Sequence, residues 1–230
     1  MDMVTKSDIL VRKCVAEFIG TFALVFAGTG AIIVNDLSGG SITNLGIGLT
    51  FGLIVSVMIF SLGHVSGAHI NPAVTLAFVV TREFPATYLF PYWIAQILGA
   101  MTASFILLYM IGDFAQLGAT VPSGSAGQSL LMEFLLSFIL MFVIMSVATD
   151  VRAVGSSAAL AIGGTVALEA IFAGHISGAS MNPARSIGPM IAAGVWSHQW
   201  IYVVGPILGA CAGGFSYQWL RGEEGLKKNN

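Results

Sequence analysis

The chain has 230 residues, of which 56% are hydrophobic and only 9% are charged, and its formal net charge is −2. Its mean hydropathy of +0.88 lies far above that of soluble domains and indicates a protein of the lipid bilayer. The sequence has no basic patch that would suggest a nucleic-acid partner. It also has no set of nucleophile, base and orienting residue that would suggest an enzyme.

Six stretches are apolar and long enough to cross about 30 Å of hydrocarbon. They cover residues 14–34, 45–63, 88–111, 130–149, 157–174 and 199–220. We expect the first to be retained, because acidic and aromatic residues stand where a signal peptide would have its small-residue cleavage site. Six spans place both termini on one side of the membrane.

Eight of the nine basic residues fall on the side of the termini, which predicts that this side is cytoplasmic. They are Lys6, Arg12, Lys13, Arg82, Arg152, Arg221, Lys227 and Lys228. We therefore expect a multi-pass integral protein of the plasma membrane or inner cell membrane. The two cysteines, Cys14 and Cys211, lie in the first and last spans and are expected to be packed thiols.

The second and fifth spans are each followed by the same phrase. HVSGAHINPAVT (64–75) and HISGASMNPARS (175–186) are identical at seven of twelve positions, at a constant offset of 111 residues. Residues 16–26 and 96–100 also recur, at 132–142 and 206–210. Each half holds three spans, an odd number, so the second half must have the opposite orientation in the membrane. We predict one channel domain over residues 1–230, with inverted repeats at 11–112 and 129–221.

Each phrase contains the tripeptide Asn-Pro-Ala, at Asn71-Pro72-Ala73 and Asn182-Pro183-Ala184, followed by an apolar piece too short to span. Asparagine is a good N-cap and proline is favoured at the first helical position, so residues 72–80 and 183–193 are predicted to be re-entrant half-helices. Entering from opposite faces, they would meet near the midplane with their N-termini together. Two positive helix ends pointing at one place repel cations and protons.

Small, flexible residues precede each half-helix and favour extended backbone, which membranes tolerate only where protein buries it or water bathes it. We expect the carbonyls of these segments to form a ladder of acceptors along a pore. These are the carbonyls of Gly67, Ala68, His69, Gly178, Ala179 and Ser180. The asparagine amides would act as donors. Such a lining serves neutral molecules that both donate and accept, such as water and polyols.

These motifs closely resemble the aquaporin, or major intrinsic protein, family over roughly residues 11–221. The resemblance implies an all-α membrane protein with six transmembrane helices and two half-helices, assembled as a homotetramer with one passive pore per subunit. It implies no cofactor and no metal. The contexts ATDVRAVG (148–155), IFAGHISGASMNPARS (171–186) and WLRGEEG (219–225) are most similar to plant nodulin-type intrinsic proteins and their bacterial relatives. Those relatives pass small neutral solutes, including undissociated metalloid hydroxides.

The family has a second constriction toward the outside, and the resemblance assigns it to Phe51, Ala170, Ala179 and Arg185. Water-selective members usually carry histidine at the place of Ala170, and polyol-conducting members a larger aromatic residue with glycine. The sequence thus predicts a channel for water and small uncharged solutes, such as glycerol-like polyols, urea and neutral metalloid hydroxides. A strictly water-selective aquaporin is the alternative. Because position 179 is not cysteine, we expect no mercurial block there.

Three acidic residues lie within the predicted spans. Glu17 and Glu133 are repeat equivalents and are expected to be structural, with donors from the backbone that leads into the half-helices. A proton relay is the alternative reading. Glu169 precedes Ala170 and has no counterpart in the first half. About 100° of helical rotation would turn it toward a loop or another subunit, and both a structural role and an influence on the outer pore remain open.

His64 and His175 are also repeat equivalents, but inversion places them on opposite faces, which argues against a shared metal ion. His64 is predicted at the inner mouth of the pore. Aromatic residues near the span ends are expected to form an interfacial belt. They include Tyr88, Tyr92, Trp93, Trp196 and Trp200. A secondary transporter and a structural junction protein remain as distant alternative functions.

Overall fold

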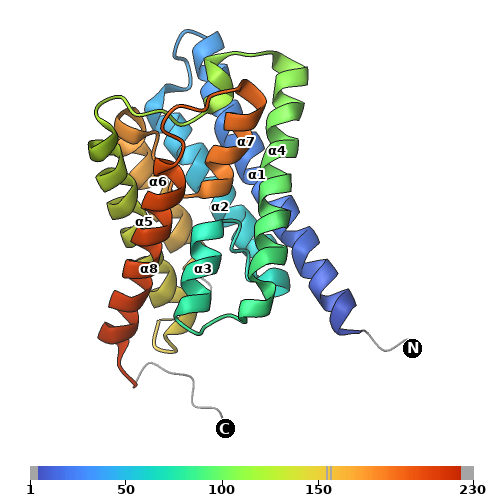
Figure 1. The fold of residues 1–230 in the computed structure, drawn as a ribbon, viewed down its shortest axis with the longest axis vertical. Helices are drawn as coiled ribbons and strands as arrows, with labels where there is room; N and C mark the ends of the chain where they lie inside the picture. The colour runs from blue at the N-terminus through green and yellow to red at the C-terminus, as the bar shows by residue number, and fades with distance from the viewer. Residues whose placement is uncertain (1–4, 154, 156, 224–230) are drawn as a thin grey trace.

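The computed structural model describes residues 5–153, 155 and 157–223, and all regular elements of this part of the chain are helices, without β-strands. The long helices stand side by side and the short helices α3 and α7 lie between them, as Figure 1 shows. The elements are α1 (Lys6–Leu37), α2 (Thr43–Ser66), α3 (Pro72–Val80), η1 (Ala86–Tyr88), α4 (Leu89–Ile111), η2 (Ala115–Gly118), α5 (Ala126–Thr149), α6 (Ala158–Ser177), α7 (Pro183–Ala193) and α8 (Ile201–Arg221).

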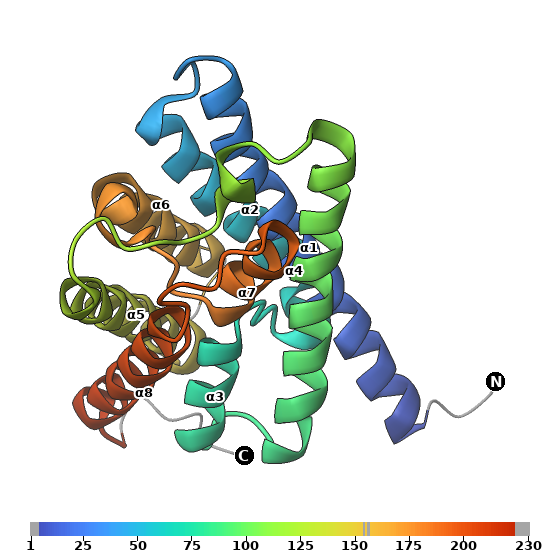
Figure 2. The ribbon, with the colours of Figure 1, turned by 45° about the horizontal axis from the view of Figure 1, so that its top comes forward.

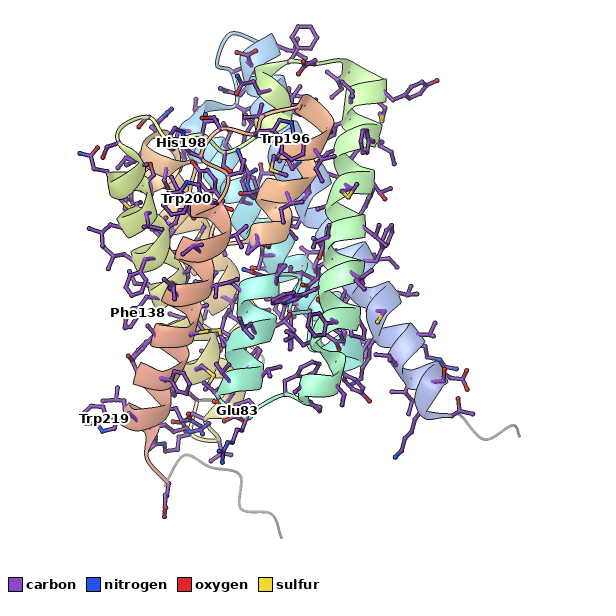
Figure 3. All side chains as sticks on the ribbon, in the orientation of Figure 1. Glu83, Phe138, Trp196, His198, Trp200 and Trp219 are labelled. Atoms are coloured by element: carbon purple, nitrogen blue, oxygen red, sulfur yellow. The ribbon has the colours of Figure 1, made fainter. Side chains whose placement is uncertain are left out.

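Among the described residues, α1, α2, η1 with α4, α5 and α6 are long and apolar enough to cross a membrane. The remaining long helix, α8, has 21 residues but includes Pro206, Gln218 and several glycines, which make it less apolar. Large apolar side chains still cover its outer face. Trp219, for example, is 83% exposed and projects away from the bundle in Figure 3. The six-span architecture predicted from the sequence is the one that the structure has.

Helix α1 begins at Lys6, earlier than the predicted span. Thr5 and Asp8 form a capping box, in which the Thr5 hydroxyl accepts from the Asp8 N–H at 3.2 Å and the Asp8 carboxylate accepts from the Thr5 N–H at 2.9 Å. These two residues satisfy backbone donors that would otherwise lack partners at the helix start. The extra turns, residues 6–13, carry most of the charged residues of α1, and Figure 1 shows them projecting beyond the neighbouring helices.

Equivalent glycines let equivalent helices approach closely in the two halves. A Cβ added at Gly99 of α4 would collide with the Phe18 carbonyl of α1, and one at Gly209 of α8 with the Phe134 carbonyl of α5. The halves are joined where α2 packs on α6, because a side chain at Gly52 would collide with the backbone of Gly163. Small residues thus set the helix spacing.

The two short helices lie in the middle of the bundle and point toward each other. Figure 2 shows α3 and α7 surrounded by the long helices, with their first turns together at the centre. The start of α1, the end of α8, the end of α3 and the α5–α6 loop lie at one end of the molecule in Figure 1. We name this the inner end, and the opposite end the outer end. The described basic residues other than Arg185 belong to inner-end segments, whereas Lys227 and Lys228 lie outside the described residues.

Candidate functional site

Each half-helix begins at the proline of its Asn-Pro-Ala motif. The side chain of Asn71 caps α3 by accepting from the Ala73 N–H at 2.9 Å, and Asn182 caps α7 by accepting from the Ala184 N–H at 3.0 Å. Proline occupies the first helical position in both, where its missing N–H costs nothing. The two positive helix ends therefore face each other at the centre of the bundle.

The two motifs are also bonded to each other. The Asn71 side-chain amide donates to the Met181 carbonyl at 2.8 Å, and the Asn182 amide donates to the Ile70 carbonyl at 2.8 Å. Each asparagine has two amide N–H groups, so one on each remains for another acceptor. The reciprocal pair fixes both amides at the meeting point of the half-helices.

The backbone before each half-helix takes the same unusual path in both halves. Left-handed φ angles recur at equivalent positions, with Gly67 at 92°, Ala68 at 46° and Ile70 at 42° in the first segment. The second segment repeats them at Gly178, Ala179 and Met181, with 92°, 42° and 53°. Non-glycine residues pay roughly 1–2 kcal/mol each for this conformation, so the surrounding structure must hold it in place.

Glu17 of α1 holds the first segment. Its buried carboxylate accepts four hydrogen bonds, from the Ser66 hydroxyl (2.7 Å), the His69 N–H (2.9 Å), the Ile70 N–H (2.6 Å) and the Gln96 amide (2.8 Å). The backbone donors expected for this acid are therefore present. Gln96 was not foreseen from the sequence, although it stands in a recurring segment.

Glu133 of α5 holds the second segment in the same manner. Its carboxylate accepts from the Ser177 hydroxyl (2.7 Å), the Ser180 N–H (2.9 Å) and the Met181 N–H (2.8 Å). The position equivalent to Gln96 is occupied by Pro206, which has no donor. The two anchors thus differ by one side-chain hydrogen bond.

Two tyrosines hydrogen-bond to the last residues of α2 and α6. The Tyr92 hydroxyl donates to the Ser66 carbonyl and the Tyr202 hydroxyl to the Ser177 carbonyl, both at 2.7 Å. The assignment of Tyr92 to an interfacial belt was wrong, because its side chain is 0% exposed. Trp93, placed in the same belt, donates its indole N–H to the carbonyl of the first residue of α3 at 2.9 Å. The 110-residue spacing of the tyrosines is the sequence signal that could have identified them.

Within the two segments, the Ile70 and Met181 carbonyls accept from the asparagine amides, and the carbonyls that precede them lack partners among the described residues. Within residues 5–153, 155 and 157–223, no protein donor bonds to the six carbonyls predicted as acceptors. They belong to Gly67, Ala68, His69, Gly178, Ala179 and Ser180. Five of these residues line a central cavity of about 140 Å³, and Gly178 lines a cavity at the outer end. Buried carbonyls need a partner, so this row can accept hydrogen bonds from whatever fills the cavities.

The central cavity and the outer vestibule, a cavity of about 210 Å³, have four lining residues in common. These are Phe51, Ala170, Ala179 and Arg185. The residues that the family resemblance assigns to the outer constriction thus lie together where the two spaces join. All four side chains are nearly buried. Two are large and two are alanines.

Arg185 lies in the first turn of α7 and is only 3% exposed. Its guanidinium donates to the Gly118 carbonyl at 2.8 Å and lies 5.0 Å from the centre of the Phe51 ring. A cation over an aromatic face is favourable by roughly 0.5–2 kcal/mol. Gly118 belongs to η2 in the α4–α5 connection, a segment with no motif that links it to the site. An arginine buried at this depth is usually functional.

The Phe51 ring packs against Gly28 of α1. A Cβ added at Gly28 would overlap the Phe51 ring, so the glycine provides the space in which the ring lies. Together, Gly28 and Arg185 fix the ring between α1 and the guanidinium. The large half of the constriction is therefore rigid, whereas Ala170 and Ala179 on the other half leave open width.

The inner mouth is a wider vestibule of about 560 Å³. His64 lines it, together with Lys13 and an ion pair in which the Arg221 guanidinium lies 2.9 Å from the Glu83 carboxylate. Figure 3 shows Glu83 at this inner end. His175 lines the outer vestibule instead, so the paired histidines lie on opposite faces. The described residues contain no cluster of three metal-ligating side chains.

The inner loop between α5 and α6 is tied to α8 through Asp150. The Asp150 carboxylate accepts from the Arg152 guanidinium at 2.6 and 2.9 Å and from the Tyr217 hydroxyl at 2.9 Å. These hydrogen bonds, with that of Arg152 foremost, hold the pKa of Asp150 well below its usual range. Asp150 therefore keeps its charge at physiological pH and fixes the inner loop.

Glu169 differs from the other two acids. Its side chain is 3% exposed within a single chain, so it does not project toward another subunit. Neither carboxyl oxygen has a hydrogen-bond partner among the described residues. It lines neither the central cavity nor the outer vestibule. Its burial does not fit the expected contact with another subunit.

Comparisons with known proteins agree with this geometry. The family model described as "Major intrinsic protein" matches residues 3–217. Aquaporin NIP1-3 of Oryza sativa subsp. japonica is 50% identical over 211 residues, which are 91% of this chain and 74% of that protein. Probable aquaporin NIP4-2 of Arabidopsis thaliana is 51% identical over 215 residues, covering 92% and 75%.

A solved structure supports the same assignment. The X-ray structure of the aquaglyceroporin from Plasmodium falciparum superimposes with a TM-score of 0.78 at 27% identity, and the match covers 90% of this chain and 95% of that one. The doubled half-helices, the crossed asparagines and these similarities agree. The chain belongs to the major intrinsic protein family, the aquaporins.

Proposed function

We propose that this channel passes water together with small uncharged solutes and excludes protons and other ions. The solutes are glycerol-like polyols, urea and neutral metalloid hydroxides. The observation that carries the proposal is the pair of alanines, Ala170 and Ala179, at the constriction. They leave width opposite Phe51 and Arg185, where a histidine would narrow the passage.

The lining of the central cavity suits such solutes. Its polar groups are the free carbonyls, the two asparagine amides and the Arg185 guanidinium. Its apolar side chains include Val55, Ile162 and Val166. A molecule that has both hydroxyls and C–H groups can contact both kinds of lining. Glycerol has both, whereas a hydrated ion gains nothing from the apolar side chains.

Ion exclusion follows from three positive features. The N-termini of α3 and α7 each carry roughly half an elementary charge and point at the same place. Arg185 adds a full positive charge at the constriction, in a setting where water screens it poorly. Family membership makes the chain a transmembrane channel rather than an enzyme, and passive conduction also distinguishes it from a transporter or junction protein.

The similar proteins support the wider solute range. The solved relative is an aquaglyceroporin by its title, and the sequence relatives are nodulin-type aquaporins. Stopped-flow light scattering on proteoliposomes tests the proposal with water, glycerol, urea and a neutral metalloid hydroxide, against empty vesicles. We expect solute permeability above that of empty vesicles for glycerol. Raised water flux with solute fluxes equal to those of empty vesicles would establish the strictly water-selective alternative.

We also propose cytoplasmic termini and a homotetramer with one pore per subunit. The basic residues at the inner end support the orientation. Large apolar side chains exposed along α2, α4 and α6, such as Leu53, Ile94 and Leu168, offer surfaces for neighbouring subunits and lipid. Protease accessibility of the N-terminus in sealed vesicles would test the orientation, and native mass spectrometry would test the assembly.

A further inference from the structure

The anchor of the second segment has one donor fewer than the anchor of the first. In the first half, the Gln96 amide donates to Glu17 at 2.8 Å and to the Thr75 hydroxyl at 3.0 Å. In the second half the equivalent residue is Pro206, and Glu133 keeps only the hydroxyl and the two backbone donors. Pro206 fills the equivalent position but offers Glu133 no side-chain donor of the kind that Gln96 offers Glu17.

Glu169 is a buried polar group of the second half that has an apolar residue at the equivalent position of the first half. An offset of 111 residues places Met58 at the equivalent position. On α6, Ala170 faces the cavity and Ala167 packs against Gly52 of α2. Since successive helical residues are about 100° apart, Glu169 falls on the flank away from α2. That flank is covered by α5, the other long helix that packs on α6.

Glu169 lies at the depth of an unpartnered hydroxyl on α5. The helices run antiparallel from a short loop, with Thr149 and Ala158 at its two ends. Ser137 lies twelve residues before Thr149 on α5, and Glu169 lies eleven residues after Ala158 on α6. At about 1.5 Å per residue, both lie roughly 17 Å from the α5–α6 loop along the helix axes. Ser137 is 1% exposed and its hydroxyl has no partner among the described residues. Glu133 lies one helical turn farther along α5.

A carboxylate without donors is strongly disfavoured in such an apolar setting, so Glu169 is held as the neutral acid. The neutral acid can donate one hydrogen bond and accept others, as an amide can. Buried water typically makes about three hydrogen bonds to polar groups that would otherwise lack partners. Glu169, Ser137 and Glu133 supply three such partners.

We propose that Glu169, as a neutral acid, holds a buried water between itself, Ser137 and Glu133, and thereby supplies the second half with the support that Gln96 gives the first. Glu169 is a positioning residue. Glu169 acts through Glu133, which holds the backbone segment before α7. That segment carries Ala179, so its position sets the width of the outer constriction. Glu169 does this from behind the pore wall, without touching the solute.

The test compares two replacements of one side chain. Glu169→Gln keeps a neutral donor, and we expect its melting temperature and glycerol-to-water permeability ratio to match those of the wild type. Glu169→Met introduces the residue that the first half has at the equivalent position, Met58. It removes the hydrogen-bonding partner that we propose for Ser137 and Glu133. We expect a melting temperature lower by about 2–4 °C and a permeability ratio changed by at least about twofold. Thr165→Val, which removes an exposed hydroxyl bonded within α6, is the matched control.

A second-site change then tests the equivalence with Gln96. Pro206→Gln in the Glu169→Met background places an amide where the first half has one, and we expect it to restore both values. Infrared difference spectra of the wild type and Glu169→Gln should reveal the C=O stretch of a protonated carboxylic acid in the wild type only. The melting temperature and the infrared spectrum do not depend on which solute the channel passes. A failure of this proposal can therefore be distinguished from a failure of the proposed function.

Three results would overturn the proposal. Glu169→Gln could be as impaired as Glu169→Met, which would mean that a charge is needed. Glu169→Met could match the wild type in melting and permeability, which would leave Glu169 without a role. Pro206→Gln could fail to restore Glu169→Met, which would end the equivalence with Gln96.

Discussion

The outer constriction has a counterpart at the inner half of the same pore, and the two differ in chemistry. The 111-residue offset relates Phe51, Ala170, Ala179 and Arg185 to Ile162, Ile59, Ala68 and Val74, in that order. All eight residues line the central cavity. The outer set contains an aromatic ring and a guanidinium, whereas the inner set is wholly aliphatic. One scaffold therefore presents two different constrictions to a passing molecule.

The surrounding framework is nearly identical in the two halves. The crossed asparagine bonds are both 2.8 Å, the tyrosine bonds are both 2.7 Å, and each segment is held by a buried glutamate. The paired half-helices contribute equally to ion exclusion, so we expect the discrimination among neutral solutes to come from positions where the repeat has diverged. Replacing outer residues by their inner counterparts tests this directly.

The largest effect is expected for Arg185→Val, which copies Val74. Removing the positive charge should raise proton conductance by about tenfold or more, if the guanidinium adds at least about 1.4 kcal/mol to the barrier for a cation. Water flux should stay within about twofold of the wild type, because the path becomes no narrower. Proton flux is measured with a pH-sensitive dye in proteoliposomes. An unchanged proton leak would assign ion exclusion to the half-helices alone.

The next effect concerns width. Ala170→His should lower glycerol permeability by about tenfold, the usual scale for discrimination by a few added atoms, while water flux is retained. Ala170→Ile, which copies Ile59, fills a similar volume without a hydrogen-bonding group and separates bulk from polarity. Stopped-flow shrinkage with each solute provides the measurement. Glycerol flux that persists in both variants would place the limiting width elsewhere.

A smaller change is expected for Phe51→Ile, which copies Ile162. The substitution removes the ring that lies 5.0 Å from the Arg185 guanidinium, an interaction of roughly 0.5–2 kcal/mol. We expect the glycerol-to-water ratio to shift by about two- to threefold, because the guanidinium keeps its bond to Gly118 but loses its second support. Leu49→Ile, at an exposed position two residues earlier in α2, is the control. A ratio equal to that of the wild type would show that the ring does not position Arg185.

The smallest effect is expected for mercurials. Wild-type water flux should be insensitive to mercury at position 179, where both halves carry alanine. Ala179→Cys should create a block, because that side chain lies at the constriction, and a reducing thiol should reverse it. Ala68→Cys tests the inner counterpart in the same assay. Strong block of the wild type would point to Cys14 or Cys211 and contradict the expectation that they are inert.

The sequence was informative where one residue type dictates local geometry. Asparagine followed by proline predicted the start of both half-helices at Pro72 and Pro183, and the structure has them there. The odd number of spans per half predicted the inversion. Burial of Glu17 and Glu133 in apolar spans required donors, and the nearby segments provide them.

Other features could not be predicted because they depend on how distant segments pack. Nothing in the local sequence of η2 marks Gly118 as the acceptor for Arg185, since its role requires the α4–α5 connection to fold over the outer vestibule. Tyr92 is an amphipathic aromatic residue but is buried, because its ring packs against His69 and Phe84 and its hydroxyl reaches the Ser66 carbonyl. The start of α1 depends on a capping box outside the apolar stretch that defined the predicted span.

The crossed asparagine bonds also constrain how the molecule can be made. They join residues 110 and 112 positions apart, one partner from each half. The first half can enter the membrane and pack its three spans, but Asn71 has no carbonyl to bind until Met181 has been synthesised and inserted from the opposite face. Contacts of such long sequence separation form late. The centre of the pore is therefore among the last parts of the protein to be completed, and a chain truncated before α7 would have no finished channel.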